Sequence, residues 1–280
     1  MWINKFTDNN HIFEVFMSNL LLIITTSEKR KRLLILLSGG PRLLDEIKTQ
    51  LNVTASGMLP QIRILEDEGL VEKEGREYTL TDLGHLIVDL LEPLDKTLTV
   101  IEQQKIFWQE HDIKALPRDL RMRIGEIENP RIVECSVEES FEPHTQFLEM
   151  ILKSKRVVGI SPIVHPIYPQ FFLSFAQTGR EVRLILTKNA FSKIKKEYYD
   201  MLLEGLQYEN AHLSVVEDNI RFAFISTDIY FCMGMFTKNG LFNSKQDIIS
   251  TEPSAIRWGD DLFSHYLNVS SIVNKEGKYR

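Results

Sequence analysis

Cysteine is scarce in this sequence. Its 280 residues include only Cys135 and Cys232, which lie far apart and have no histidine or cysteine neighbours at the spacing of metal ligands. Neither a zinc site nor a disulfide framework is indicated, and we expect no metal and no cofactor. The apolar run at residues 20–24 is too short to span a bilayer, which takes about 20 residues. It also lacks the basic start and the small-residue cleavage site of a secretory signal. We therefore expect a cytoplasmic protein with no membrane partner.

A surplus of positive charge is absent as well, because the formal net charge is −6. Residues 1–112 carry the whole deficit, whereas residues 113–280 are balanced. Non-specific affinity for nucleic acid should therefore be modest. The sequence also has no glycine-rich phosphate loop, no nucleophile elbow and no metal-ligand spacing. We expect no catalytic residues and no enzyme activity.

What the sequence does contain is an ordinary share of core-forming residues, 43% hydrophobic with 26% charged. This balance is typical of globular domains, and the length suggests two of them. The most informative stretch is residues 43–81, LLDEIKTQLNVTASGMLPQIRILEDEGLVEKEGREYTLT. Its first part predicts a short amphipathic helix, because its apolar residues recur every three or four positions. The inward stripe would consist of Leu43, Leu44, Ile47 and Leu51.

A second helix should follow after a tight turn. Thr54 or Ser56 can cap it by accepting a hydrogen bond from a free backbone amide, and Gly69 is typical of the left-handed position that ends a helix. The buried stripe would consist of Met58, Ile62 and Leu65. Residues 70–74 and 77–81 then predict two short strands around a Gly-Arg hairpin tip. Two helices across a short turn, followed by a hairpin, indicate a winged helix-turn-helix.

Two features of this segment argue against DNA binding by a single copy of the domain. Pro60 stands inside the second helix, so that helix either starts late, at Ser56, or is kinked. From residue 27 to residue 84 the sequence has nine Lys and Arg against ten Asp and Glu. DNA binding would then require the cations to gather on one face and two copies of the domain to act together.

The segments VTASGMLPQIRILEDEGLV and EYTLTDLG resemble the winged-helix domains of prokaryotic transcription regulators of the arsenic-repressor-like type. The resemblance implies that the second helix enters the major groove of double-stranded DNA and that the wing touches the backbone or the minor groove. Glutamine suits an adenine edge and arginine a guanine edge, while flexible cations suit phosphates. The DNA-binding residues implied are Thr54, Ser56, Gln61, Arg63, Lys73 and Arg76.

Helices are predicted on both sides of this domain. Residues 1–26 place Phe13, Phe16, Met17, Leu20 and Ile24 at helical spacing, for packing on their own domain or on a dimer mate. Ser27 caps the next helix, whose basic run at residues 29–32 we interpret as a solvated face rather than a DNA contact. Residues 82–112 predict one long helix that Pro93 bends or breaks. Its near-heptad leucine spacing favours a homodimer, although packing on the second domain would leave the same pattern.

From residue 113 onward, strand-like runs alternate with helical stretches. Strands are expected at residues 156–161, 182–186, 213–216, 222–226 and 229–237. Helices are expected at residues 166–177, 192–206 and 255–266. This alternation predicts an α/β domain with a mixed sheet, largely parallel and with an antiparallel edge.

The second half resembles the C-terminal domain of archaeal winged-helix regulators of the methanogenesis regulatory protein family. The segments that carry this are VVGISPIVHP, VRLILTKNAF, FAFISTDIYFCMGMFTKNGLFNSKQDIIS and SAIRWGDDLFSHYLNVSSIV. The resemblance implies a dimeric DNA-binding transcription regulator whose second domain senses a signal. We divide the chain into a winged domain at residues 1–82, a linker or dimerisation helix at 83–112 and a sensing domain at 113–280. The alternative is an adaptor whose winged domain binds another protein.

A ligand site is expected beyond the carboxyl ends of two predicted strands, where helix N-termini favour anions. Lys188 and His165 would hold a small anionic effector, with Ser161, Thr187 and Asn189 as polar contacts. The simpler interpretation is that Ser161 and Asn189 cap helices and that Lys188 is solvated. The arrangement also resembles phospholipase-D-like sheets, but those have lysine two residues after the histidine. His165 is followed instead by Pro166 and Ile167, which speaks against such an enzyme.

Overall fold

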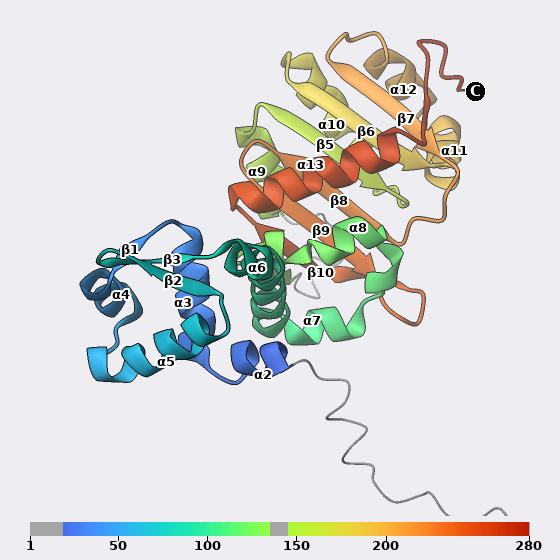
Figure 1. Cartoon of the computed structure of the whole chain (residues 1–280). Helices are drawn as coiled ribbons and strands as arrows, with labels where there is room; N and C mark the ends of the chain where they lie inside the picture. Colours follow the sequence, from blue (N-terminus) through green and yellow to red (C-terminus); the bar gives the residue numbers. More distant parts are fainter. Residues whose placement is uncertain (1–18, 135–144, 280) are drawn as a thin grey trace, which may run out of the picture. The chain divides into compact units, whose positions relative to one another are not determined.

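The computed structural model describes residues 19–134 and 145–279, so Cys135 and the aromatic start of the predicted leading helix, Phe13, Phe16 and Met17, lie outside them. The chain divides into two compact units, residues 1–94 and residues 95–280, each with its own hydrophobic core (Figure 1). Helix α6 (Asp82–Gln103) supplies residues to both units.

Unit 1 contains several helices, which share one core, and a small sheet. In chain order its elements are α2 (Asn19–Thr25), α3 (Glu28–Ser38), β1 (Arg42–Leu43), α4 (Leu44–Leu51), α5 (Ala55–Asp67), β2 (Val71–Glu74), β3 (Glu77–Leu80) and the first part of α6. The strands pair antiparallel in the order β1-β3-β2. Helices α4 and α5 followed by the β2–β3 hairpin are the arrangement of a winged helix-turn-helix.

Local signals in the sequence set the ends of these helices. The Ser27 hydroxyl accepts a hydrogen bond from the Arg30 amide at the start of α3, and the Thr54 hydroxyl accepts one from the Gly57 amide at the start of α5. Asn52 and Gly69 adopt left-handed backbone conformations at the ends of α4 and α5. The apolar stripes meet in one core, whose fully buried members include Leu33, Leu34, Leu37, Ile47, Met58, Ile62 and Leu65. Ile24 of α2 joins this core, so the described end of the leading helix packs on its own unit.

Two expectations for unit 1 need correction. Leu43 does not belong to the buried stripe of α4, because it is 41% exposed and pairs as strand β1 with Glu77. Pro60 does not delay the start of α5, since the helix begins at Ala55 and runs through the proline to Asp67. The side chain of Pro60 is exposed, and the proline removes only one backbone donor from the second turn.

The long helix predicted at residues 82–112 is shorter than expected. Helix α6 passes through Pro93 without interruption and ends at Gln103, and a separate helix α7 (Lys105–Glu110) follows. Two side-chain hydrogen bonds lie at this break. The Gln104 side chain donates to the carbonyl of Pro130, 26 residues away, and the Trp108 indole donates across the break to the Val100 carbonyl. One side of α6 carries an exposed leucine stripe: Leu83, Leu86, Leu90, Leu94 and Leu98, each 44–69% exposed.

Unit 2 is built on an eight-stranded sheet in the order β11-β7-β6-β5-β8-β9-β10-β4. Its strands are β4 (Arg131–Glu134), β5 (Arg156–Ser161), β6 (Glu181–Thr187), β7 (Ala211–Val216), β8 (Phe222–Thr227), β9 (Phe231–Phe236), β10 (Phe242–Ser250) and β11 (Ser271–Ile272). Its helices after α7 are η1 (Ile113–Ala115), α8 (Arg118–Met122), η2 (Ile124–Glu126), α9 (Thr145–Lys153), α10 (Tyr168–Gln177), α11 (Lys188–Glu197), α12 (Tyr199–Gly205) and α13 (Pro253–Leu267).

A mixed sheet is confirmed, but it is not largely parallel. Among the described strands only β5, β6 and β7 run parallel to one another, and every other pairing is antiparallel. Helices join the parallel strands, whereas β8, β9 and β10 follow one another in a meander that turns at Gly240. The helix predicted at residues 192–206 is interrupted at Tyr198, whose backbone leaves the helical region between α11 and α12.

Helices cover both faces of this sheet (Figure 1). One face packs against α13, α7 and α8 around the fully buried Trp258, whose indole donates to the Leu120 carbonyl. The other face packs against α9 and α10 over the central strands and against α11 and α12 over β6 and β7. On the second face the helices leave a cavity above the strands.

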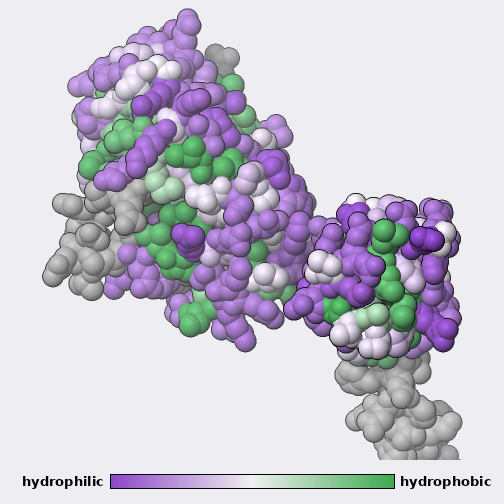
Figure 2. Space-filling view, turned by 90° about the vertical axis from the view of Figure 1, so that its left-hand side faces the viewer, coloured by the Kyte–Doolittle hydropathy of each residue, from purple (hydrophilic) through white to green (hydrophobic). Residues whose placement is uncertain are grey.

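Apolar side chains also reach the surface of each unit. Figure 2 shows apolar patches within an otherwise hydrophilic surface on the side that it draws. Among the described residues, no helix is long and apolar enough to cross a membrane.

Candidate functional site

The exposed side of α5 carries three of the side chains predicted to meet DNA. Thr54, Ser56 and Arg63 are exposed, whereas the apolar stripe of α5 is buried beneath them. Thr54 is already engaged as the cap of the helix. The Ser56 hydroxyl lies 3.3 Å from the Thr54 hydroxyl and shares a hydrogen bond with it, so Arg63 is the most available polar group of the three. The guanidinium of Arg63 can therefore reach a base or a phosphate without first breaking a contact within the protein.

Gln61 is placed differently from the expectation. Its side chain is half-buried, and its Oε1 atom accepts hydrogen bonds from Arg30 Nη1 at 2.7 Å and from Ser27 Oγ at 3.3 Å. The paired contact of a glutamine with an adenine edge needs both the oxygen and the nitrogen of the amide. In this structure Gln61 holds α5 against the start of α3 and would have to release Arg30 before it could read a base.

Lys29 is a cation near α5 that we interpreted as part of a solvated face. A Cβ atom built on Gly57 would lie 3.0 Å from Lys29 Nζ, so this ammonium group lies beside the first turn of α5. The free backbone amides of a helix N-terminus attract anions such as phosphates. The packing of α3 against α5 creates this neighbourhood, which is why the basic run alone did not indicate it.

The wing has mixed charge. Lys73 and Arg76 are exposed on the hairpin, and Lys73 Nζ lies 5.5 Å from the centre of the Tyr78 ring across the β2–β3 pair. Glu72, Glu74 and Glu77 are exposed on the same hairpin. The cations of unit 1 that could approach a phosphate are therefore interleaved with carboxylates on the wing and are less so at the start of α5.

The ligand residues predicted for unit 2 fall into two groups. Strands β5 and β6 are parallel neighbours, so the loops that follow them lie at one edge of the sheet, as expected. Ser161 and His165 line a cavity there, but Thr187, Lys188 and Asn189 do not. Thr187 is the buried cap of α11 and accepts from the Ala190 amide. Lys188 makes an exposed ion pair with Glu217 at 3.0 Å, and the nearby carboxylate raises the pKa of the lysine.

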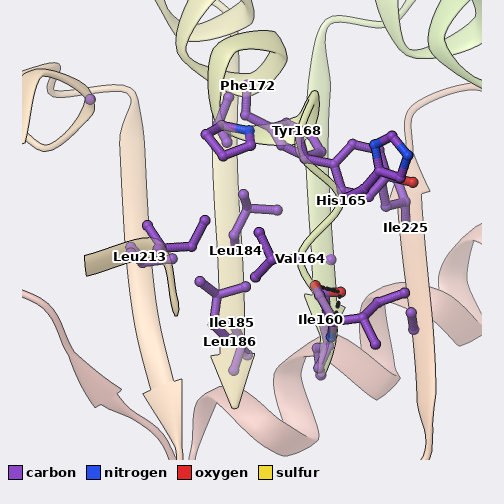
Figure 3. Close-up of a pocket in the computed structure, with 18 of the residues that line it drawn as sticks. Ile160, Val164, His165, Tyr168, Phe172, Leu184, Ile185, Leu186, Leu213 and Ile225 are labelled. Carbon is purple, nitrogen blue, oxygen red and sulfur yellow. Dashed lines mark hydrogen bonds between the residues drawn. The ribbon is translucent and has the colours of Figure 1, made fainter. Parts of the chain in front are cut away.

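This cavity has a volume of about 260 Å³ and lies within unit 2. Figure 3 shows Leu213, Leu184 and Ile225 on separate strands, with Tyr168 and Phe172 from α10 above them. The cavity is lined mainly by leucine, isoleucine, valine and phenylalanine. Sequence reasoning placed Ser161 and His165 here but missed the apolar lining, because those residues are indistinguishable from core residues until the helices are placed.

One acidic residue of the cavity also went unnoticed. Asp247 of β10 lines it together with Cys232 of the neighbouring strand β9. Burial raises the pKa of Asp247 to about 6 and raises the pKa of the Cys232 thiol. A carboxylate in such surroundings is destabilised relative to its protonated form, and groups of this kind are common at functional sites.

Two family descriptions match the chain. Residues 140–269 match the middle domain of the methanogenesis regulatory protein FilR1, and residues 21–103 match the HVO_A0261 N-terminal domain. The chain is also 23% identical over 222 residues to the methanogenesis regulatory protein FilR1 of Methanothrix harundinacea (strain 6Ac). These matches support an archaeal regulator family for the chain. It spans half the length of that relative, and the aligned part is 78% of the chain.

Solved structures give weaker likenesses. TrmBL2, described as an archaeal chromatin protein with a novel mode of DNA binding, aligns with 90% of this chain and 97% of its own at 13% identity and a TM-score of 0.41. Phosphatidylserine synthase of Haemophilus influenzae Rd KW20 aligns with 54% of this chain and 41% of its own at 8% identity and a TM-score of 0.40.

Proposed function

We propose that this chain is a transcription regulator that binds double-stranded DNA through unit 1. The observation that carries the proposal is the exposed side of α5, where Ser56 and Arg63 face away from the core and Lys29 lies beside the first turn. The matches to an archaeal regulator family support the same conclusion. A helix of this kind can enter the major groove with its first turns against the base edges.

The side chains have different proposed roles. Arg63 reads a guanine, because a guanidinium can donate two hydrogen bonds to the guanine edge. Lys29, Lys73 and Arg76 contact phosphates, which position the protein and add salt-dependent affinity without sequence information. Ser56 contacts a base or a phosphate, while Thr54 and Gln61 fix the position of α5.

We infer that the regulator is a homodimer joined through α6. At 100° per residue the exposed leucines Leu83, Leu86, Leu90, Leu94 and Leu98 fall within one stripe of about 120°, and an exposed apolar stripe of this length favours burial against a second copy. A dimer would present two copies of α5 to two half-sites. Two copies would make twice as many contacts between cations and phosphates, which would offset the lack of net positive charge in a single unit 1.

Unit 2 is proposed to sense a small molecule in its cavity. Because α6 belongs to both units, a change in unit 2 has a direct covalent route to the winged domain. A coupling of about 1 to 3 kcal/mol between ligand and operator would change operator affinity from severalfold to about a hundredfold.

The mixed charge of the wing favours a second candidate, an adaptor whose winged domain binds another protein. A DNA-reading wing needs cations against the phosphates, whereas Glu72, Glu74 and Glu77 would repel them. The two candidates differ in their dependence on DNA sequence and on salt.

The deciding experiment is a salt series of binding to DNA from the protein's own promoter region, with random DNA as competitor. A regulator should prefer the promoter DNA and lose affinity steeply with salt, with a slope of about −0.9 per phosphate contact. Arg118→Ala is the matched control for variants of α5, because Arg118 is an exposed arginine of unit 2. Absence of any preference over random DNA, with and without ligand, would favour the adaptor.

A further inference from the structure

The cavity of unit 2 exists because small residues stand side by side on the sheet. Ala223 of β8 is paired with Gly234 of β9, and Gly234 is paired with Asp247 of β10. Gly159 lies on the adjacent strand β5 between Leu184 and Ile225. Helices α10 and α12 rest on the larger side chains around this row, which leaves about 260 Å³ above it. The hollow is therefore a consequence of sequence rather than of a displaced helix.

The described lining of this cavity contains no permanently cationic side chain for an anion, although His165 and His212 belong to it. Among the described residues no lysine or arginine contributes to the lining, and Lys188, the cation predicted from sequence, is held outside it by Glu217. The Ser161 hydroxyl is satisfied by its own turn, donating to the Ile163 carbonyl at 2.6 Å and accepting from the Ile163 amide at 3.3 Å. Asp247 is the one carboxylate among the described lining residues, and it lies apart in sequence from the polar residues His165, Tyr168 and His212.

The position of Asp247 is defined by Gly234. A Cβ atom at residue 234 would lie 2.5 Å from Asp247 Oδ1, so the carboxylate lies directly over the glycine. Within residues 19–134 and 145–279 the structure gives Asp247 neither a hydrogen bond nor an ion pair. Asp247 is half-buried and lines the cavity. A ligand that fills the cavity would take water away from this carboxylate, which is costly unless the ligand brings a hydrogen-bond donor.

We propose that the cavity binds a small molecule with an apolar body and a hydrogen-bond-donating end that pairs with Asp247, rather than the anionic effector expected from sequence. The proposal rests on the proposed sensing function and names its ligand class. Amines, amides and similar donors fit this description, whereas carboxylates and phosphates do not. A water molecule takes about 30 Å³ in the liquid, so the cavity holds a ligand of about nine non-hydrogen atoms.

Three compounds with the same eight-carbon chain test the head group directly. n-Octylamine, octanamide and octanoate are titrated into the full-length protein at pH 8 by calorimetry, with no DNA present. Octylamine and octanamide should bind about tenfold more tightly than octanoate, because only they can donate to Asp247. Octanoate binding as tightly as octylamine would overturn the proposal.

Two variants assign the preference to this cavity. Asp247→Asn should abolish the advantage of octylamine over octanoate, whereas Asp200→Asn, at an exposed position on α12, should preserve it. Ala223→Leu should weaken binding of octylamine at least about tenfold, because the added side chain occupies the hollow. If that variant does not fold, Leu184→Phe on strand β6, another lining residue of the cavity, serves the same purpose. A folded variant that binds octylamine normally would overturn the location.

The same titrations separate this inference from the proposed regulation. Each compound is then added to the protein bound to its promoter DNA. Octylamine that binds the protein with the predicted selectivity but leaves DNA affinity unchanged supports the ligand class and contradicts sensing. Octanoate that changes DNA affinity through the cavity, lost in Ala223→Leu, supports sensing and overturns the ligand class.

Discussion

The exposed side of α5 and the cavity of unit 2 differ in the kind of contact that each offers to its proposed target. On α5 the proposed contacts are polar side chains held in water by a rigid helix, and the apolar residues lie beneath them as scaffold. In unit 2 mainly apolar residues form the cavity, and Asp247 is the one carboxylate of its described lining. Exposed charges act through long-range attraction that salt screens, whereas an enclosed apolar site acts through burial. Binding at the two sites should therefore respond differently to salt.

We expect the strongest effect from Leu90→Lys on α6. The leucine stripe of this helix is apolar, as the cavity is, and exposed, as the polar side of α5 is. Leu90 is 69% exposed in the single chain. Burying a leucine stabilises by roughly 1.5 to 3 kcal/mol, and a symmetric dimer loses two of them. We expect the dimer to weaken by about 3 to 6 kcal/mol, measured by analytical ultracentrifugation.

Asp89→Lys provides the control for this variant. Asp89 is exposed on α6 and lies off the leucine stripe, so a lysine there tests charge without touching the proposed interface. Equal weakening by both variants would show that net charge, rather than the stripe, controls association. A protein that stays dimeric with Leu90→Lys would remove α6 as the interface.

Most of unit 1 was predictable because its signals are local. Thr54, Ser27 and Gly69 mark helix ends through bonds to neighbouring residues, and stripes such as Met58 and Ile62 report burial directly. The end of α6 was not predictable, because Gln104 is fixed by a carbonyl 26 residues away. The prediction of a largely parallel sheet in unit 2 was wrong for the same reason, since the alternation of strands and helices does not reveal which strands become neighbours.

Asp247→Asn tests whether the cavity carries the electrostatic penalty that distinguishes it from α5. Burial raises the pKa of Asp247 from 3.8 to about 6, so the folded state holds the proton more tightly than the unfolded state. Stability should therefore fall as the pH rises from about 4 to about 6 and stay lower above that. The variant should be more stable than the natural chain at pH 8, by at most about 3 kcal/mol, and equal to it near pH 4.

Urea unfolding at the two pH values measures this difference, with Asp200→Asn as the exposed control. The control should match the natural chain at both pH values. An Asp247→Asn protein that gains nothing at pH 8 would mean that the carboxylate is solvated. The cavity and the exposed side of α5 would then differ in shape but not in the solvation of their charged groups.

Arg63→Ala applies the corresponding test to α5. If Arg63 reads a base, the variant should lose about 1 to 3 kcal/mol of binding to promoter DNA and much less to random DNA. Competition titrations measure both affinities, and Arg118→Ala should leave them unchanged. Equal loss on the two DNAs would reassign Arg63 to a phosphate.

The candidate sites were only partly predictable, for a physical reason. Helical periodicity identifies the apolar stripe that is buried, and residues outside that stripe, such as Ser56 and Arg63, are then predicted to be exposed. Gln61 satisfies the same rule, yet a tertiary contact with Arg30 engages it. The cavity depends on Ala223 and Gly234 being paired across strands, and no sequence pattern specifies an unfilled volume.

Arg76→Ala should have the weakest effect and tests the wing, the part of unit 1 least suited to DNA. Arg76 is exposed at the hairpin tip among three exposed glutamates, so its phosphate contact is partly offset. We expect a loss of under about 1 kcal/mol at moderate salt, equal on promoter and random DNA, and a salt slope shallower by about 0.9. Glu74→Gln should do the reverse, strengthening binding by relieving repulsion. If neither variant changes the slope, the wing lies away from the DNA, and the cations beside α5, Lys29 among them, must account for the salt dependence.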